Sequence, residues 1–448
     1  EVVVNVTYDG QDPVAANLYG AFDIWAVEQS SGAWHRVADY YGYSTPRELS
    51  TGTRLLPGTY DLMYVSSTYS GETATTHFGL TDGASRDIVY GRKYLARDVV
   101  VGSGATVLGI DVPVATIAPA VTYEGLDPAT AGLYGSFDIW AVDQATGAWH
   151  RVADYYGYGS NDELQTGTHL LPGTYDLLYM ATTYSGDSAF THFGESNAGT
   201  AAIMYGSTFL QRDLVVTDDG ANAFAVDVQE AAIAPSVTYN GADPAAASLY
   251  GAFDIWAVSQ ETGGWHRIAD YYGYGSNDEL TLGTRLPPGT YDVLYVSSTY
   301  SGASAYRYFD LDDGSPEVTY GTMVVQRGLV VSAGGANPIA IDIRPTAVSP
   351  VLTYEGQDPV ASGLYGAFDV WAVARETDTW HRIVDYYGYS NPDELQYTQR
   401  LLPGVYDLVY LASTYSGDSA YTTFGISDST SPDVVYGRNT LRACVLVP

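Results

Sequence analysis

The sequence has 448 residues, of which 52 are acidic and 19 are basic, so its net charge is −33. Binding to nucleic acid is therefore almost excluded, because phosphate recognition needs clustered Lys and Arg side chains. No run of eighteen apolar residues occurs, so the sequence predicts no membrane-spanning helix. Glu1 stands where an unprocessed chain would begin with Met, and we expect an exported protein whose signal peptide has been removed.

One pattern recurs four times along the chain. Its first landmark is a Thr-Tyr pair that ends at Tyr8, Tyr123, Tyr239 and Tyr354, so the copies are about 115 residues apart. A segment of that length can bury enough apolar surface to fold by itself. The sequence predicts four domains, which we call repeats 1 to 4 and place at residues 1–115, 116–231, 232–347 and 348–448.

Each repeat opens with a predicted strand and an acidic turn. In repeat 1 the strand is Val2–Tyr8, and the turn contains Asp12-Pro13, a pair that favours turns. A β-hairpin is expected over residues 22–43, because aromatic and β-branched residues flank the small polar pair Ser31-Gly32. After a polar loop, a turn at Pro57-Gly58 leads into a further strand.

The second half of each repeat continues with short β segments. A strand is expected to end near Phe78, the region around Asp82-Gly83 differs between copies, and strands are expected at 88–90, 98–101 and 107–112. About eight strands without a convincing helix indicate an all-β fold. Only a segment with two prolines, 112–119, joins repeat 1 to repeat 2. The predicted fold class is four tandem Ig-like or prealbumin-like β-sandwich domains arranged as a rod.

The stretch Leu56-Pro57-Gly58-Thr59-Tyr60-Asp61-Leu62 recurs with few changes in all four repeats. It is similar to the Pro-Gly-x-Tyr strand of prealbumin-like β-sandwich domains, such as carboxypeptidase-regulatory-like domains and the B-type repeats of pilins and adhesins. With Gly437-Arg438-Asn439 and Asp111-Val112-Pro113, it resembles more closely the tandem sandwich repeats of exported bacterial surface proteins of the myxobacterial type. The resemblance covers about half of each repeat and implies an extracellular stalk, spacer or adhesive module without catalytic residues. Pilin repeats of this kind form Lys–Asn isopeptide bonds, which a chain with the single lysine Lys93 cannot form in four domains.

A histidine recurs beside Trp and Arg in each hairpin, and an aspartate follows four residues later, as in His35 and Asp39. The equivalent histidines are His150, His266 and His381. A general base with an orienting carboxylate is one interpretation. However, no nucleophile, metal-ligand spacing, phosphate-binding loop or cysteine pair recurs with it. Four near-identical copies suit reach or avidity better than catalysis, so we expect no enzyme, no catalytic residue and no cofactor.

Acidic residues in two loops leave structural Ca²⁺ as an open alternative. Asp9 and Asp12 in the first turn, together with pairs such as Asp162-Glu163, could supply oxygen ligands. Repeat 1 has only Glu48 in the second loop, and the regular Asp-x-Asp-x-Asp spacing is missing. Solvated turn residues are the favoured interpretation, and no metal site is predicted.

Tyrosines are frequent, and adjacent tyrosines in a strand must point to opposite faces. The Tyr-Tyr-Gly-Tyr motif therefore places some side chains at a surface, where they could stack on sugars, contact another domain or subunit, or line loops. Contact with protein is favoured over glycan binding, because both faces of the hairpin are partly apolar. The predicted surface-contact residues are Tyr41, Tyr43, Tyr156, Tyr158, Tyr272, Tyr274, Tyr387 and Tyr389.

Repeat 4 is shorter than the others. Alignment with repeat 1 sets Cys444 on Asp98 and Val447 on Val101, so repeat 4 lacks the last strand and should leave an apolar slot. We expect copies to join head to tail, one end completing or capping the other by strand addition. The alternative is that the chain is a piece of a longer array of repeats. The predicted joining residues are Val2, Val3, Val4, Val6, Cys444, Val445, Leu446 and Val447.

The single cysteine, Cys444, has two interpretations: an intermolecular bridge or free thiol, or a small buried hydrophobic residue. The sequence as a whole predicts a structural subunit of an extracellular or cell-surface filament, with copies of itself as partners. The alternative is a multivalent adhesin or glycan-binding stalk that uses the tyrosine loops.

Overall fold

The computed structural model describes residues 1–69, 87–159, 162–182, 202–220, 222–275, 278–300, 317–390, 392–415, 419–420 and 433–448. The strand predicted to end near Phe78 and the variable region at Asp82-Gly83 lie outside the described residues. Within them the fold is almost entirely β and forms tandem β-sandwich repeats, which confirms the predicted all-β class and the tandem β-sandwich domains. No helix in this part of the chain is long and apolar enough to cross a membrane.

The described chain forms two compact units, divided between Glu230 and Ala231. The first unit contains repeats 1 and 2, and the second contains repeats 3 and 4. The first strands of repeats 2, 3 and 4 begin at Ala115, Ala231 and Thr346, within two residues of the predicted starts.

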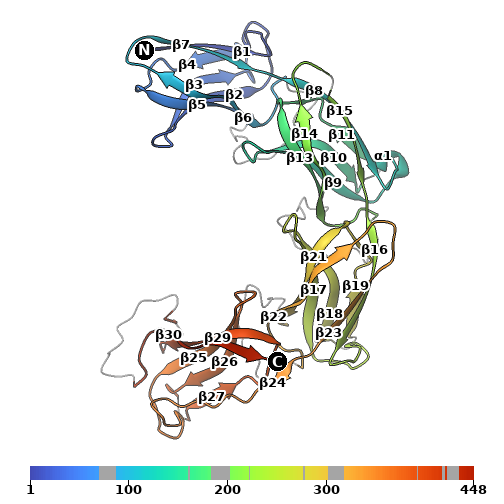
Figure 1. The fold of residues 1–448 in the computed structure, drawn as a ribbon, viewed down its shortest axis with the longest axis vertical. Coiled ribbons are helices and arrows are strands. Elements are labelled where there is room, and N and C mark those ends of the chain that lie inside the picture. Colours follow the sequence, from blue (N-terminus) through green and yellow to red (C-terminus); the bar gives the residue numbers. More distant parts are fainter. Residues whose placement is uncertain are drawn as a thin grey trace. The chain divides into compact units, whose positions relative to one another are not determined.

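Repeat 1 is a sandwich of one large and one small sheet (Figure 1). Its strands are β1 (Val2–Tyr8), β2 (Ala21–Glu28), β3 (Trp34–Tyr41), β4 (Glu48–Thr51), β5 (Gly58–Ser67), β6 (Arg92–Val101) and β7 (Thr106–Val112). The large sheet is antiparallel with the order β4-β3-β2-β5-β6, and the small sheet pairs β1 with β7. Val4 of β1, Phe22 of β2 and Ile110 of β7 belong to one hydrophobic core, so the two sheets pack face to face.

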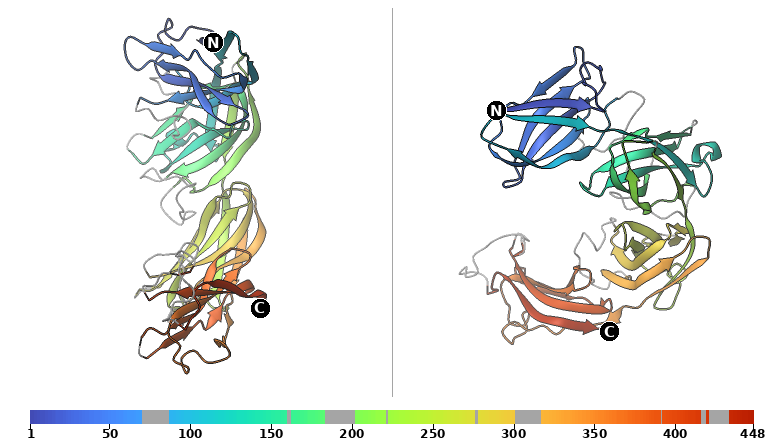
Figure 2. Two further views of the ribbon diagram at one scale, coloured as in Figure 1. Left: turned by 90° about the vertical axis from the view of Figure 1, so that its left-hand side faces the viewer. Right: turned by 45° about the horizontal axis from the view of Figure 1, so that its top comes forward.

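The first and last strands of repeat 1 are parallel partners. Their register runs from Val2 opposite Thr106 to Tyr8 opposite Val112, and Figure 2 shows the two strands side by side in dark blue and cyan. Parallel strands need a long crossover connection, which here is the whole large sheet. The last strand of a repeat therefore completes the sheet that the first strand begins.

Repeats 2 and 3 have the same arrangement, with one more short strand in the small sheet. The strands of repeat 2 are β8 (Ala115–Tyr123), β9 (Gly135–Asp143), β10 (Trp149–Gly157), β11 (Glu163–Thr166), β12 (His169–Leu170), β13 (Gly173–Thr182), β14 (Ser207–Val216) and β15 (Asn222–Val228). Those of repeat 3 are β16 (Ala231–Tyr239), β17 (Gly251–Ser259), β18 (Trp265–Gly273), β19 (Glu279–Leu282), β20 (Arg285–Leu286), β21 (Gly289–Ser298), β22 (Thr322–Val331) and β23 (Asn337–Ile343). Both small sheets again pair the first and last strands in parallel.

Repeat 4 keeps the large sheet but not the parallel pair. Its strands are β24 (Thr346–Ala347), β25 (Ala367–Ala374), β26 (Trp380–Tyr387), β27 (Glu394–Tyr397), β28 (Arg400–Leu401), β29 (Gly404–Ser413) and β30 (Arg438–Val447). The predicted alignment agrees with the register, because Val447 pairs with Gly404 as Val101 pairs with Gly58. Residues 348–353, which correspond to most of β1, form no strand, and Val351 is 93% exposed.

Three local features differ from the predictions. The short edge strand β4 lies in the expected polar loop, and the helix α1 (Pro128–Ala131) follows the first turn of repeat 2. Residues 88–90 form no strand, because tyrosine side chains bond their backbone instead. The Val89 N–H donates to the Tyr8 hydroxyl (2.6 Å), and the Val89 carbonyl accepts from the Tyr64 hydroxyl (2.5 Å).

Buried tyrosines account for much of the tyrosine content. The largest fully buried side chains among the described residues are all tyrosines, including Tyr40 and Tyr60. The Tyr40 hydroxyl donates to the Leu18 carbonyl (2.6 Å), and the Tyr60 hydroxyl donates to the Leu56 carbonyl (2.8 Å). Each bond satisfies a polar group inside the sandwich and ties the sheet to a neighbouring loop.

A β-bulge shapes the hairpin of each repeat. In repeat 1 the register between β2 and β3 shifts between Ile24 and Trp25, so Val37 and Ala38 are both buried although they are adjacent. Trp25 lies on the outer face of the sheet. Phe22, Ile24 and Ala26 of β2 point inward and belong to the core of repeat 1.

Candidate interaction surfaces

Four tyrosines meet on the surface of repeat 1, and we call them the tyrosine cluster. Tyr43 is the centre, with ring centroids 5.1 Å from Tyr19, 5.7 Å from Tyr41 and 5.6 Å from Tyr69, all in edge-to-face geometry. The Tyr43 hydroxyl donates to the Ser67 carbonyl (3.1 Å), which fixes the central ring. Because Tyr69 is 72% exposed and Tyr41 is 39% exposed, the cluster presents a fixed aromatic surface to solvent.

The same cluster recurs in the other repeats. Its described members are Tyr134, Tyr156 and Tyr158 in repeat 2, Tyr250, Tyr272, Tyr274 and Tyr300 in repeat 3, and Tyr365, Tyr387, Tyr389 and Tyr415 in repeat 4. The structure therefore brings each predicted pair of surface tyrosines together, with the second of the pair as the half-buried centre. What these tyrosines contact stays a prediction.

An arginine lies between two aspartates on the outer face of each hairpin. Arg36 Nη1 is 3.4 Å from Asp23 Oδ1 and 3.0 Å from Asp39 Oδ2. Burial and the nearby Asp39 raise the pKa of Asp23 to about 6, while Arg36 opposes the shift. Asp39 thus pairs with Arg36. If His35 were a general base oriented by a carboxylate, Asp39 would have to lie beside His35 instead. The equivalent triads are Asp138–Arg151–Asp154, Asp254–Arg267–Asp270 and Asp369–Arg382–Asp385.

The recurring histidine and the Leu-Pro-Gly-Thr-Tyr turn form one element, which we call the plug. In repeat 1 it consists of His35, Leu56 and Tyr60. The hydroxyl-to-carbonyl bond from Tyr60 to Leu56 closes the turn, and the His35 ring lies edge-on to Tyr60 with centroids 6.0 Å apart. The same two contacts form the plugs of repeat 2 (His150, Leu171, Tyr175) and repeat 4 (His381, Leu402, Tyr406).

In the first unit, the plug of repeat 2 inserts into repeat 1. Leu171 is fully buried and belongs to the hydrophobic core of repeat 1. His150 is also buried, and its Nδ1 lies 3.3 Å from the Tyr90 carbonyl oxygen. A Cβ on Gly91 would be 2.2 Å from the His150 ring, so only glycine allows this approach. We call Tyr90-Gly91 and its counterparts the socket.

This joint could not be predicted from the sequence, although the sequence contains a signal for one half of it. A Tyr-Gly pair recurs as Tyr90-Gly91, Tyr205-Gly206, Tyr320-Gly321 and Tyr436-Gly437. A glycine at the same position of every copy is a signal of close approach by another group. The identity of that group, the next repeat's histidine, depends on how two domains face each other and is not a local property of the sequence.

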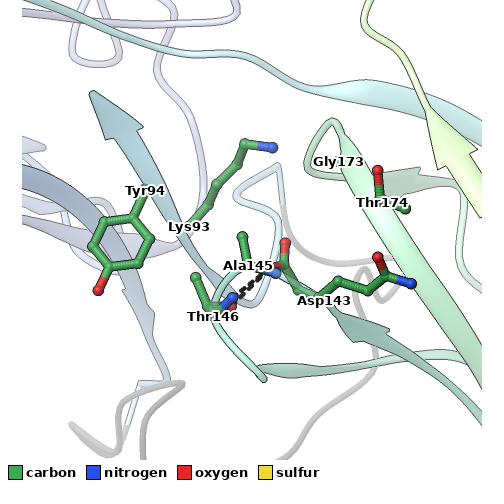
Figure 3. A pocket seen from close by; sticks show the side chains of 8 residues that line it. Lys93, Tyr94, Asp143, Ala145, Thr146, Gly173 and Thr174 are labelled. Atoms are coloured by element: carbon green, nitrogen blue, oxygen red, sulfur yellow. Dashed lines mark hydrogen bonds between the residues drawn. The ribbon is translucent and has the colours of Figure 1, made fainter. Parts of the chain in front are cut away.

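A cavity of about 360 Å³ lies beside the joint in the first unit, and Figure 3 shows the side chains that line it. Lys93 enters from repeat 1 and Asp143 from repeat 2. Burial lowers the pKa of Lys93, although Asp143 opposes the shift. Asp143 Oδ1 also accepts from the N–H groups of Ala145 (2.8 Å) and Thr146 (2.7 Å). These contacts favour a structural gap in the joint over an active site.

In the second unit, the plug of repeat 4 inserts into repeat 3 in the same way. Leu402 is buried in the core of repeat 3, and His381 Nδ1 lies 3.4 Å from the Tyr320 carbonyl oxygen. Arg400 donates to the Glu317 carbonyl beside this contact. The plug and the socket are therefore a repeated joint and not a feature of one pair of repeats.

The plug of repeat 1 is not covered by any residue that the structure describes. Leu56 is 69% exposed and Trp34 is 45% exposed, whereas Leu171 and Leu402 are fully buried. A hollow of about 640 Å³ lies at this face of repeat 1 and is lined by Glu1, His35, Thr53, Arg54, Leu55 and Leu56.

Among the described residues, a socket is open as well. It belongs to repeat 4, where a Cβ on Gly437 would meet nothing within 4 Å. Val435, two residues before Gly437, is 55% exposed, whereas its counterpart Val89 in repeat 1 is 1% exposed. Repeat 4 therefore presents the surface on which repeats 1 and 3 each hold a plug.

The predicted joining residues near the start of the chain lie in β1. Val2, Val4 and Val6 are buried in repeat 1, and only Val3 is exposed, at 45%. Donating this segment to another chain would remove a strand from repeat 1. That these residues join two chains stays a prediction, and the loss of a strand from repeat 1 would be the energetic cost of such a contact.

The other predicted joining residues lie in β30, which pairs with β29. Cys444 is exposed, so the interpretation of a buried hydrophobic residue is wrong. Its φ is 54°, and its N–H donates to Asp407 Oδ1 (2.9 Å) at a β-bulge. Leu446 is 71% exposed, whereas Val447 points into the core.

The acidic turns hold their aspartates in backbone contacts. Asp12 Oδ1 accepts from the N–H groups of Val14 (2.9 Å) and Ala15 (3.0 Å), and Asp111 Oδ1 of β7 accepts from the N–H of Gly10 in the turn (3.0 Å). Among the described residues, no group of three or more His, Cys, Asp and Glu side chains could hold a metal ion. These backbone contacts suit turn residues, and the absence of a calcium site stays a prediction.

Truncating the inserted leucine tests the joint. Leu171→Ala should lower the free energy of unfolding by about 2–5 kcal/mol, because it leaves a cavity in the core of repeat 1. Leu56→Ala removes the same side chain from the exposed plug and should cost less than about 1 kcal/mol. Urea denaturation of both variants measures the difference. Equal losses would contradict the inserted position of Leu171.

The joint should weaken in acid. Burial lowers the pKa of His150 to about 4, with Asp143 opposing the shift and Lys93 and Arg92 adding to it. The unfolded state therefore binds the proton more readily, so this contribution is present above pH 6.5 and is lost as the pH falls towards 4. The stability difference between the wild type and His150→Gln should shrink by up to roughly 3 kcal/mol from pH 7 to pH 4.

Subtracting the free energy of unfolding of His150→Gln from that of the wild type removes the contributions of the other titrating groups. Burial raises the pKa of Asp138 to about 7, so protonation of this carboxyl stabilises the folded protein as the pH falls. This contribution is the same in the wild type and in His150→Gln. A stability difference that stays constant over this pH range would contradict the assigned role of His150.

No family model and no curated protein matches this sequence. Among solved structures, an adhesin candidate from Bacteroides ovatus is similar over 53% of this chain and 90% of its own, with 10% identity and a TM-score of 0.20. The SGBP-B protein of the Bacteroides ovatus mixed-linkage glucan utilization locus, solved with a mixed-linkage heptasaccharide, matches 89% of this chain and 82% of its own, with 12% identity and a TM-score of 0.10. Similarities this low assign neither a family nor a function to the chain.

Proposed function

We propose that this protein is a structural, non-enzymatic component of an extracellular or cell-surface filament in which copies associate head to tail. The observation that carries the proposal is the repeated joint, in which Leu171 enters the core of repeat 1 and Leu402 enters the core of repeat 3. Burying a leucine contributes roughly 1.5–3 kcal/mol, so bending at a joint has a substantial energetic cost. An array of such joints keeps the spacing and orientation of neighbouring repeats more constant than flexible linkers would.

The connections between repeats support a mechanical role. Only Pro113 and Val114 separate β7 from β8, so the last strand of repeat 1 leads almost directly into the first strand of repeat 2. A short connection with proline restricts rotation, unlike a Gly/Ser linker. Tension applied along the chain would pass from strand to strand.

The net charge of −33 supports contact at the ends over contact along the sides. Lateral association would bring many carboxylates together, and their repulsion opposes it at low salt. End-to-end contact brings only a small part of each surface together. The charge therefore favours single filaments over bundles.

Strand addition at repeat 4 remains a second route to the same end-to-end contact. Residues 348–353 lack the parallel partner that β7 provides for β1. Tyr354 and Tyr410 are only half-buried, whereas their counterparts Tyr8 and Tyr64 are buried. A donated strand with alternating apolar residues would cover them.

A multivalent adhesin or glycan-binding stalk is the second candidate, and the tyrosine clusters favour it. Exposed aromatic rings offer flat apolar faces beside polar hydroxyls, which suits contact with sugar rings. Several clusters on one chain would add avidity to weak individual contacts.

Electron microscopy of the purified full chain tests the proposal. We expect regular filaments whose length grows with protein concentration. Single particles at every concentration would contradict a filament. If those particles bind glycans and lose binding when Tyr41 and its equivalents are replaced by Ala, the adhesin is the better account.

A further inference from the structure

We infer that the open plug of repeat 1 docks into the open socket of repeat 4 in a second copy of this chain, and so reproduces the joint found inside each unit. The inference rests on the proposed filament, because it specifies the contact that joins the copies.

The plug of repeat 1 carries the same side chains as the docked plug of repeat 4. His35, Arg54 and Leu56 correspond to His381, Arg400 and Leu402. Its turn is already closed by the bond from the Tyr60 hydroxyl, although the Leu56 side chain is 69% exposed. Docking therefore needs little further ordering, which reduces the entropic cost of association.

The socket of repeat 4 matches the socket of repeat 3 in its backbone. Asp433 stands in the place of Glu317, and the N–H of each donates to a tyrosine carbonyl at 2.7 Å. The Asp433 carbonyl is thus held as the Glu317 carbonyl is, ready to accept from Arg54 as Glu317 accepts from Arg400. Gly437 leaves free the space that Gly321 gives to the His381 ring.

A second copy is the occupant that these contacts favour. The two open surfaces belong to one chain and are complementary halves of the joint that is found within each of its two units. The contact is heterologous, so each docked copy presents a new free plug or socket and the assembly propagates. Docking also uses side chains that are already exposed, whereas strand exchange through β1 would unfold part of repeat 1.

Charges placed on the two surfaces give a decisive test. Leu56→Asp disables the plug, and Val435→Asp disables the socket, because each puts an unpaired charge into the contact. Each change should raise the concentration needed for self-association by at least about a hundredfold. Val107→Asp is the matched control, since Val107 is 66% exposed on β7 and should assemble as the wild type. Circular dichroism of each variant checks that it remains folded.

Mixing the two variants adds a measurement that misfolding cannot imitate. Each alone should sediment as a single chain of 48.1 kDa, whereas the mixture should form a species of twice that mass and no larger. The intact plug of Val435→Asp would then occupy the intact socket of Leu56→Asp, and the remaining ends could not extend.

The outcomes separate this inference from the filament proposal. If wild-type chains form filaments and Leu56→Asp or Val435→Asp forms them equally well, or if the mixture does not pair, the docking inference is wrong and the filament survives. If the wild type stays at 48.1 kDa at every concentration, both are wrong.

Discussion

The arrangement of the repeats depends on a tyrosine hydroxyl that holds the carbonyl of a leucine four residues earlier. In repeat 2 the Tyr175 hydroxyl donates to the Leu171 carbonyl at 2.6 Å, and the turn between them contains Pro and Gly. The bond fixes the turn at the end of the sandwich, and the leucine side chain projects away from its own sheet. It is then buried in the core of the neighbouring repeat. Two domains thereby share one hydrophobic core, which a flexible linker would not allow.

The same residue type serves the interior, the turns and the surface. Tyr40 and Tyr64 fill the core and bond loop carbonyls, Tyr60 closes the plug, and Tyr41 and Tyr43 form the exposed cluster. Tyrosine suits all three positions because its ring is apolar and its hydroxyl reaches a polar partner. A sandwich built in this way has loops that are tied to its sheets, which suits a protein whose role is to hold a shape. The joints extend that order from one repeat to the next.

Local patterns predicted most of the fold and little of the joint. The alternation that buries Phe22 and Ile24 and the period of the repeats are properties of short stretches, so the strands and the β class could be predicted. The edge strand β4 was missed because its residues are polar and mostly exposed, and residues 88–90 were misassigned because tyrosine side chains replace the ladder there. His150 could be located on the predicted hairpin, but its partner Gly91 lies in another domain. Contacts between domains depend on how folded surfaces meet, and no single stretch of sequence encodes them.

The distance between two spin labels on repeats 1 and 2 tests most directly whether the joint is rigid. Cys444→Ser removes the native thiol, and Val107→Cys and Val215→Cys provide label sites that are 66% and 62% exposed. The joint predicts one narrow distance distribution by double electron–electron resonance, and Leu171→Asp should broaden it. A broad distribution with Leu171 intact would contradict the account, because the repeats would then move independently.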